Sequence, residues 1–422
     1  MDLLSELEWR DLVYDRTEGL RDALAAGRTT GYIGFDPTAS SLHVGSLLPI
    51  LLLARLQRAG HTPIALVGGG TGMIGDPSGK TQERTLLTPE QVDENLAGIR
   101  AQLARFLDFD AAGNPARILN NADWLRPYEL IAFLRDIGKH FTVNYMMAKE
   151  SVKRRIEGDE GISFTEFSYL LLMAYDFVVL FDRFGCTLQM GGSDQWGNIT
   201  AGMDLIRKLR GAHAHGLVAP LVTTTAGVKF GKTEAGTIWL DPNRTSPFHF
   251  YQFWLHTDDR DVDRYLKFFT FLTRDEIAAL ARETATAPER REAQRTLARS
   301  VTALVHGDEQ VARAERAAAV LFGEGLSQAT VEDVLMVFAD APSTSIALPL
   351  DGMPLVDMLA AVKLAASKSD ATRLLKSGGV YVNNVRATDE RARLTVADAI
   401  GGKLILLRKG RRDQHLVRVL RS

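Results

Sequence analysis

Residues 29–67 constrain the fold most, because they read as a buried strand, a polar turn, a helix and a second strand. The run at 29–35 combines β-branched, glycine and aromatic residues, as buried parallel strands do. Leucines recur at helical spacing over 43–60, and a short apolar run follows at 63–67. Strand, helix and strand in this order make a βαβ unit, so we expect an α/β fold around a parallel sheet.

The turn between the first strand and the helix is the first candidate site. Asp36, Pro37 and Thr38 break regular structure, and His43 stands where the helix begins. Free backbone N–H groups and the positive end of the helix dipole meet at such a point, which suits a phosphate group. A plain helix cap with a surface histidine is the alternative interpretation.

The glycine-rich segment at 68–81 contains two tempting patterns. Gly70, Gly72 and Gly75 satisfy the dinucleotide pattern G-x-G-x-x-G, but the next residues read Asp-Pro-Ser-Gly where a helix should run. The part at 75–81 resembles a P-loop with one residue too few between its glycines. Neither a nicotinamide site nor a P-loop is predicted.

A later apolar helix, expected over 163–180, carries polar residues on one face. Tyr169, Met173 and Asp176 stand at positions i, i+4 and i+7. A phenol and a carboxylate in a sealed core are costly without partners. They indicate either satisfied structural hydrogen bonds or a pocket for a polar ligand.

A short strand at 188–190 runs into the phrase Gly191-Gly192-Ser193-Asp194-Gln195. Ligands of open α/β sheets bind beyond the carboxyl ends of strands, and glycines there permit close approach. Asp194 and Gln195 are suited to hold ribose hydroxyls.

Composition excludes several classes of site. With 422 residues, 45% of them hydrophobic, the chain can form two or three domains with a large core. Its one cysteine, Cys186, allows no disulfide within the chain, and His213 and His215 lack a nearby third ligand, so no metal site is predicted. The chain opens without a signal-peptide pattern, and no apolar run is judged long enough for a membrane span. We therefore expect a cytoplasmic protein with no membrane contact.

Charge is unevenly distributed along the chain. The formal net charge is −2, yet residues 351–422 hold 14 Lys and Arg against 7 Asp and Glu. A basic tail on an acidic body favours a polyanionic partner for the tail, with a merely solvated surface as the alternative.

Three motifs in a fixed order carry a family resemblance. His43-Val44-Gly45-Ser46 resembles the His-Ile-Gly-His motif of class I aminoacyl-tRNA synthetases, and the basic loop Lys229-Phe230-Gly231-Lys232-Thr233 resembles their Lys-Met-Ser-Lys-Ser loop. The sequence at 34–39 and the Gly-Gly-Ser-Asp-Gln motif at 191–195, between these two motifs, resemble bacterial tyrosyl-tRNA synthetases in particular. The resemblance runs from about residue 31 to the C-terminus.

The resemblance implies an α/β architecture in several parts. Residues 1–222 are expected to form a Rossmann-like parallel-sheet catalytic domain, with a dimer-forming insertion near 120–160. The basic loop and a helical anticodon-binding domain are expected at 223–325. A Ser-, Thr-, Ala- and Pro-rich linker is expected at 326–350, and a small α+β S4-like RNA-binding domain at 351–422. In that last domain the sequence predicts a hairpin around an Asn-Asn turn at 383–384.

The implied reaction has two steps. Tyrosine and ATP give tyrosyl-adenylate and pyrophosphate, and tyrosine then passes to the 3′ end of tRNA(Tyr). The attacking carboxylate is ionised at pH 7, so catalysis must come from positioning and from stabilising charge on the phosphates rather than from a general base. ATP is expected as a substrate accompanied by Mg²⁺, with no tightly bound cofactor. A homodimer is the expected assembly.

The resemblance also assigns residues. Catalytic contacts to the phosphates fall to Thr38, His43, Lys229, Lys232 and Thr233. Further ATP contacts fall to Asp36, Gly45, Ser46, Gly192 and Asp194. Tyrosine contacts fall to Tyr32 and Asp176 at the phenol, Asp76 and Tyr169 at the ammonium, Gln195 at the carboxylate, and Met173 beside them. Contacts to tRNA fall to Lys80, Arg84, Arg373, Lys376 and Arg386.

Three positions depart from the family pattern. Ser46 replaces the second histidine of its motif, Ile33 replaces a frequent cysteine, and Met173 replaces a glutamine that helps to hold the substrate ammonium. We therefore expect weakened tyrosine binding with activity retained.

Two rival functions follow from the same resemblance. The first is a catalytically silent, synthetase-like RNA-binding or splicing protein, which would be expected to lose the phosphate-binding residues; Thr38, His43, Lys229 and Lys232 are all present. The second is a relative that charges another aromatic amino acid, and the pair of Tyr32 and Asp176 argues against it.

Overall fold

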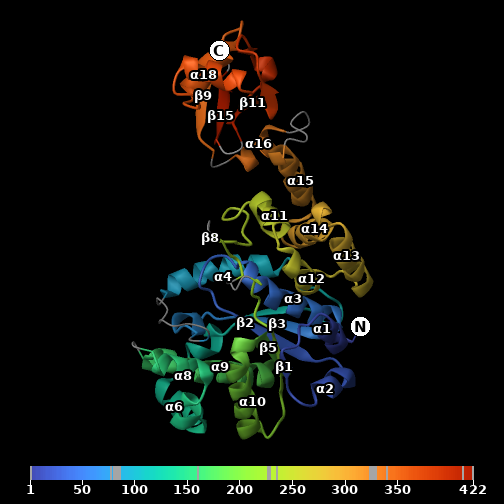
Figure 1. The fold of residues 1–422 in the computed structure, drawn as a ribbon. Helices are drawn as coiled ribbons and strands as arrows, with labels where there is room; N and C mark the ends of the chain where they lie inside the picture. The colour runs from blue at the N-terminus through green and yellow to red at the C-terminus, as the bar shows by residue number, and fades with distance from the viewer. Residues whose placement is uncertain are drawn as a thin grey trace. The chain divides into compact units, whose positions relative to one another are not determined.

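The computed structural model describes residues 2–76, 78, 87–158, 161–225, 230–233, 236–322, 330–338, 341–410 and 413–420 (Figure 1). The chain falls into two compact units. The first comprises Met1–Thr245 and Leu255–Val305, and the second comprises Ser246–Trp254 and His306–Ser422.

The first unit is built on a six-stranded sheet of order β1-β6-β5-β2-β3-β4. Its strands are β1 (Asp15–Arg16), β2 (Thr30–Phe35), β3 (Thr62–Val67), β4 (Arg117–Asn120), β5 (Cys186–Gly192) and β6 (His215–Ala219). All neighbours pair in parallel except β1, which runs antiparallel to β6. The central strands β2 and β3 are almost continuously buried, which explains their apolar runs. The predicted Rossmann-like parallel sheet is confirmed.

Helices connect and cover these strands. The N-terminal half of the first unit contains α1 (Leu3–Trp9), α2 (Leu20–Ala26), α3 (Val44–Arg58) and α4 (Pro89–Leu103). After β4 come the short helices α5 (Ala122–Leu125), α6 (Leu130–Asp136), α7 (Val143–Met147) and α8 (Glu150–Ile156), then α9 (Phe164–Phe184) and α10 (Trp196–Arg210). A two-stranded ribbon, β7 (Lys232–Thr233) and β8 (Gly236–Thr237), and the helices α12 (Asp259–Phe269), α13 (Arg274–Thr286) and α14 (Glu292–His306) follow. Helix α11 (Pro247–Leu255) belongs to the second unit for most of its length.

Helix α9 corrects one expectation from the sequence. Among the described helices it is long and apolar enough, by length and composition, to cross a membrane. Most of its apolar window is buried, however, and residues such as Ala174, Phe177 and Leu180 belong to the core cluster of the first unit. Core packing accounts for its composition.

The second unit contains a five-stranded sheet of order β12-β11-β14-β15-β9. Its strands are β9 (Ser343–Ala347), β11 (Val380–Val382), β12 (Val385–Ala387), β14 (Leu404–Lys409) and β15 (Asp413–Leu420). Helices α15 (Asp308–Phe322), α16 (Val331–Val337), α17 (Leu355–Ala361) and α18 (Lys368–Lys376) and the small pair β10 (Met353–Pro354) and β13 (Arg393–Leu394) complete it. Strands β11 and β12 form the predicted hairpin, and its turn residues Asn383 and Asn384 both have positive φ, as a type I′ turn requires.

The segment predicted as a linker, 326–350, contains regular structure. Helix α16 contributes Val334 to a buried cluster with Leu404 and Leu416, and β9 pairs in parallel with β15. Part of this segment therefore belongs to the fold of the second unit. The predicted domain boundaries remain a prediction.

Candidate active site

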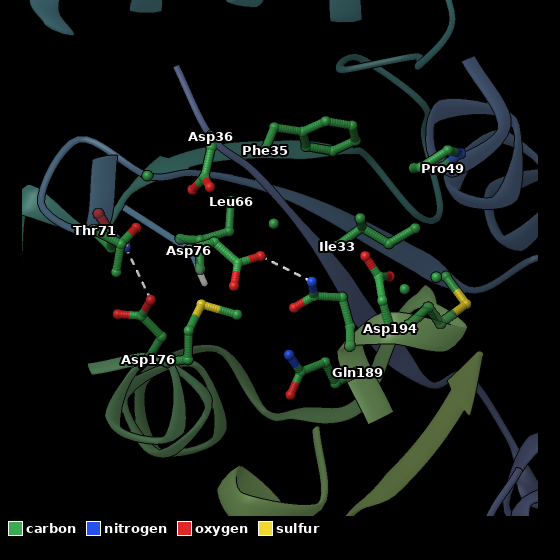
Figure 2. Close-up of a pocket in the computed structure, with 18 of the residues that line it drawn as sticks. Ile33, Phe35, Asp36, Pro49, Leu66, Thr71, Asp76, Asp176, Gln189 and Asp194 are labelled. Atoms are coloured by element: carbon green, nitrogen blue, oxygen red, sulfur yellow. Dashed lines mark hydrogen bonds between the residues drawn. The ribbon is translucent and has the colours of Figure 1, made fainter. Parts of the chain in front are cut away.

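A cavity of about 270 Å³ opens at the carboxyl ends of the central strands of the first unit (Figure 2). Its wall includes Ile33–Phe35 of β2 with the following Asp36, Leu66 of β3 with Gly68 just after that strand, and Met190–Gly192 of β5. This is where an open parallel sheet is expected to bind ligands. The cavity also contacts Gly45 and Pro49 of α3.

One end of the cavity is formed by a carboxylate with two donors. Asp176 is fully buried and accepts hydrogen bonds from Asn121 Nδ2 at 2.9 Å and Trp124 Nε1 at 2.7 Å. Burial nevertheless raises the pKa of Asp176 to about 7, from an ordinary value of 3.8. Asn121 is itself fixed, because its side chain accepts from Gly70 N at 2.7 Å and donates to Thr71 Oγ1 at 2.8 Å. The orientation of the carboxylate is thus set before any ligand arrives.

The sequence interpretation missed Asn121 and Trp124. The available signal was their place directly after β4, at the same sheet edge as the other candidates.

Two buried oxygen atoms near this end have no hydrogen-bond partner among the described residues. The hydroxyl of Tyr32 is buried without a hydrogen bond, and so is Oε1 of Gln189, which lines the cavity. The two residues are paired in register on the neighbouring strands β2 and β5. Burial, followed by the charge of Asp176, raises the pKa of Tyr32 well above its usual range. The phenol of Tyr32 therefore stays protonated and able to donate.

A hydrogen-bonded chain crosses the middle of the cavity. Gln195 Nε2 donates to Asp76 Oδ2 at 2.9 Å, and Asn198 Nδ2 donates to Gln195 Oε1 at 2.8 Å. The backbone N–H of Ser78 donates to the other oxygen of Asp76 at 2.9 Å. Tyr169 and Met173 of α9 line the same space. The structure thus brings the predicted tyrosine-site residues Asp76, Tyr169, Met173, Asp176 and Gln195 to one cavity.

Several of the predicted ATP contacts also line it. These are Asp36, Gly45, Gly192 and Asp194. Burial, followed by the charge of Asp76, raises the pKa of Asp194. At position 192 a Cβ atom would meet Asp194 Oδ1 at 2.7 Å, so only glycine leaves that carboxylate in place.

The remaining predicted phosphate contacts of the first motif lie outside the cavity lining. Thr38 and His43 are exposed, and Ser46 is half-buried. His43 caps α3, because its Nδ1 accepts from Gly45 N at 3.0 Å. A Cβ at Gly45 would approach the imidazole to 2.6 Å. The histidine therefore acts as a helix cap while its ring remains at the surface.

The backbone brings the basic loop to the same helix start. Val44 N donates to Ile238 O at 3.0 Å, and Ile238 N donates to Gly231 O at 3.1 Å. Gly231 lies so close that a Cβ there would be 2.6 Å from Val44 Cγ2. Two motifs far apart in the sequence are therefore adjacent in the fold.

Some predicted residues cannot be placed. Lys80, Arg84 and Lys229 lie outside the described residues, and only the backbone of Lys232 and Thr233 is described, as strand β7. Within the described residues no group of three or more His, Cys, Asp or Glu side chains could hold a metal ion.

The predicted RNA contacts of the second unit are exposed and partly engaged. Arg373 pairs with Asp370 at 2.6 Å, and Lys376 pairs with Glu390 at 3.4 Å. Arg386 Nε donates to the Gly378 carbonyl at 2.7 Å. Such surface pairs are weak and can be exchanged for phosphate contacts.

Comparisons with known proteins cover both units. The family described as tRNA synthetases class I (W and Y) matches residues 25–323, and the Tyrosine--tRNA ligase SYY-like C-terminal domain matches residues 333–417. A tyrosine--tRNA ligase of Roseiflexus castenholzii is 58% identical over 99% of each chain, and one of Geobacillus stearothermophilus is 55% identical over 99% of this chain and 100% of its own. A C-terminally truncated mitochondrial tyrosyl-tRNA synthetase of Aspergillus nidulans shares 34% identity and a TM-score of 0.66, covering 74% of this chain and 92% of its own.

Proposed function

The chain belongs to the class I tRNA synthetases and is a tyrosine–tRNA ligase, and from this premise we propose how its residues carry the two steps of the reaction. The catalytically silent alternative has no support among these full-length relatives.

Asp176 and Tyr32 bind the phenolic hydroxyl of tyrosine in this proposal. Two observations support this: two donors fix the Asp176 carboxylate, and the buried Tyr32 hydroxyl has no partner among the described residues. The substrate hydroxyl donates to Asp176 and accepts from Tyr32. A site built this way rejects phenylalanine, because that substrate leaves the buried Tyr32 hydroxyl unpaired and gives Asp176 no donor beyond Asn121 and Trp124.

The other polar groups of the cavity hold the amino-acid end. Asp76 and Tyr169 bind the ammonium group, and Gln195 lies at the carboxylate. The bond from Gln195 to Asp76 holds both side chains where these two substrate groups meet. Met173 offers no hydrogen bond at this place, so we expect tyrosine to bind with fewer polar contacts than in relatives with a glutamine there.

Adenylate formation needs charge stabilisation more than proton transfer. A carboxylate oxygen of tyrosine attacks the α-phosphorus of ATP, and the bond from that phosphorus to the pyrophosphate oxygen breaks. Gly45 and Asp36 accommodate the nucleotide, while Gly192 and Asp194 hold the ribose. Thr38, His43, Ser46, Lys229, Lys232 and Thr233 stabilise the phosphates. The adjacency of Gly231 and Val44 supports this division, because it brings the basic loop to the start of α3. Mg²⁺ enters with ATP.

The second step transfers tyrosine to a terminal ribose hydroxyl of tRNA(Tyr). Lys80 and Arg84 are proposed contacts for the acceptor end, and Arg373, Lys376 and Arg386 for another part of the tRNA. Contacts of this kind weaken as salt rises, since binding releases counterions. We place the enzyme in the cytoplasm with its tRNA.

A homodimer is proposed from the surface of the predicted insertion. Leu130, Ile131 and Val143 of this insertion, and Phe164 just after it, are large apolar side chains that are more than half exposed in the single chain. A second copy of the chain is the proposed cover. Analytical ultracentrifugation should show a dimer that Ile131→Asp converts to monomer; a monomeric wild type contradicts this.

ATP–pyrophosphate exchange tests the proposed site. Tyrosine, phenylalanine, tryptophan and ring-substituted tyrosines are offered separately to the full-length protein. Exchange with tyrosine is expected, with phenylalanine and tryptophan near background. Exchange with phenylalanine equal to that with tyrosine would refute the phenol assignment. Exchange only with a substituted tyrosine would indicate a change of specificity at Met173, and no exchange at all would refute the catalytic assignments.

A further inference from the structure

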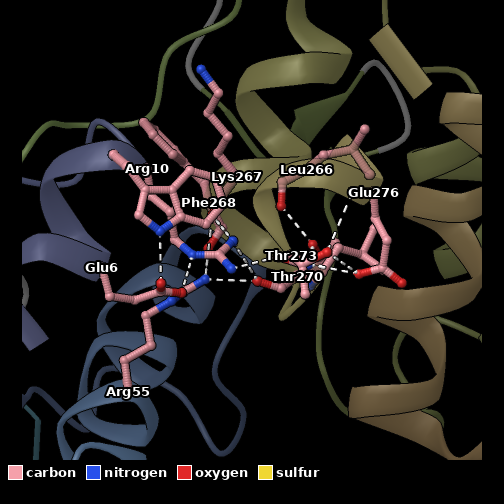
Figure 3. A network of polar contacts seen from close by, with 11 residues as sticks. Glu6, Arg10, Arg55, Leu266, Lys267, Phe268, Thr270, Thr273 and Glu276 are labelled. Atoms are coloured by element: carbon pink, nitrogen blue, oxygen red, sulfur yellow. Dashed lines mark hydrogen bonds and ion pairs between the residues drawn. The ribbon is translucent and has the colours of Figure 1, made fainter. Parts of the chain in front are cut away.

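Two buried arginines donate hydrogen bonds to backbone carbonyls at the C-terminal end of helix α12 (Figure 3). Arg55 of α3 donates through Nη2 to the carbonyls of Lys267, Phe268 and Thr270 at 3.3, 3.0 and 2.9 Å. Arg10, held by Glu6 at 2.6 Å, donates to the carbonyls of Lys267, Thr270 and Leu272. The last carbonyls of a helix lack intrahelical partners, and cations at that end are favoured by the helix dipole.

Burying Arg55 between α3 and α12 costs folding stability. Its side chain is fully buried, and its Nε and Nη1 atoms have no hydrogen-bond partner among the described residues. Glu6 pairs directly with Arg10, and its charge also acts on the guanidinium group of Arg55. A buried charge with incomplete pairing costs stability, and apolar side chains of similar volume often serve a core as well or better. Core packing alone therefore does not explain Arg55.

Helix α12 is also the support of the basic loop. Phe230 stacks on Phe269 of α12, with ring centroids 5.2 Å apart and an interplanar angle of 11°, and meets Tyr265 edge-on at 5.1 Å. The segment that leads into the loop is tied to the same helix, because Thr225 donates to Asp261 from both its N–H and its hydroxyl.

These contacts form a closed circuit of three segments within the first unit: the start of α3, the basic loop and α12. The start of α3 touches Gly231, the neighbouring Phe230 rests on α12, and the end of α12 returns to α3 through Arg55. The length of α3 between Val44 and Arg55 therefore sets where the loop lies relative to His43.

We propose that Arg55 is a positioning residue for adenylate formation, which holds the end of α12 against α3 and thereby fixes the basic loop beside the start of α3. The inference rests on the proposed phosphate role of Lys229 and Lys232. Arg55 does not line the substrate cavity, so it acts through Phe230 rather than by contact with tyrosine.

Arg55→Met in the full-length protein tests this by ATP–pyrophosphate exchange. We expect kcat to fall by about 10- to 100-fold, the size of effect that a small misplacement of reacting groups produces, with KM for tyrosine unchanged. Arg58→Met is the matched control: it lies one turn away on α3, over the ring of Phe271, and donates to none of the α12 carbonyls among the described contacts. It should keep wild-type kcat, and thermal unfolding of both variants separates lost activity from lost fold.

A double-mutant cycle distinguishes positioning from a general structural role. Phe230→Leu removes the stacked ring, and if Arg55 acts through that ring, the double variant is little worse than the more damaging single one. If the fold-losses in kcat of the two single variants multiply in the double variant, the two residues act independently and the proposal is overturned. A rise in KM for tyrosine with kcat unchanged in Arg55→Met would overturn it as well. Should Arg55→Met not fold, Arg55→Lys is measured in its place, and an unchanged kcat there has the same consequence. Loss of exchange in the wild type would instead refute the proposed function.

Discussion

Replacing Met173 with glutamine should strengthen tyrosine binding. Met173 is 8% exposed on α9, one turn from Tyr169, and lines the cavity with Asp76 and Gln195. Both side chains are unbranched and similar in volume, so the substitution neither opens a large cavity nor overpacks the site. The gain is an amide oxygen that can accept from the substrate ammonium.

The magnitude follows from two opposing terms. A hydrogen bond to a charged group contributes about 1.5–3 kcal/mol, which corresponds to a roughly 10- to 100-fold change in affinity. Without substrate, the new amide occupies a mostly buried position, and an unpaired polar group there costs about 1–3 kcal/mol of folding stability. We therefore expect KM for tyrosine to fall by about tenfold, while the free energy of unfolding falls by about 1–3 kcal/mol.

Exchange kinetics over a tyrosine titration measure this effect, and urea unfolding measures the stability term. Met173→Leu is the control, because it keeps an apolar side chain of similar volume and should leave KM unchanged. A folded Met173→Gln enzyme with an equal or higher KM would refute the reasoning, since position 173 would then not face the ammonium group.

Three further predictions concern buried carboxylates. Asp176→Ala should abolish discrimination between tyrosine and phenylalanine in exchange, a factor of about 10⁴–10⁵ that is known for tyrosyl enzymes as a class rather than worked out from this structure; unchanged discrimination contradicts the assignment. The pKa of Asp176 is raised to about 7, so the protonated carboxyl group stabilises the folded state fully below about pH 4. As pH rises from about 4 to 7 the free energy of unfolding should fall by up to about 4 kcal/mol. Urea unfolding of Asp176→Asn should lack this pH dependence. Arg155→Met leaves Glu166, 3% exposed, without its buried partner at 2.9 Å and should cost about 3–5 kcal/mol in urea unfolding, whereas Arg154→Met, which breaks an exposed pair, should cost less than about 1 kcal/mol.

Local patterns predicted the central elements well. Strand β3 covers the predicted run at 63–67, and α3 begins directly after His43, because apolar runs, helical spacing and capping are local properties. Asn121 and Trp124 escaped prediction as partners of Asp176, since only the sheet order brings the end of β4 to α9. Arg55 escaped for a related reason: an arginine within a leucine-rich helix reads as a solvent-facing residue until α12 is seen to cover it.

Strand β9 shows how composition alone misleads. Its residues Ser343–Ala347 are small and mostly polar, and they read as a linker. Their strand character comes from β15, far along the chain, which supplies the ladder of backbone hydrogen bonds.

The parallel pairing of β9 with β15 bears on how this chain is made. A ribosome releases β9 before the whole of 348–412, so this strand waits several seconds for its partner at synthesis rates of about 5–20 residues per second. An apolar strand exposed for that time would be an aggregation hazard, whereas Ser343, Thr344 and Ser345 are readily solvated. The polar residues that make β9 read as a linker in the sequence therefore also keep it solvated between its own synthesis and the synthesis of its partner strand β15.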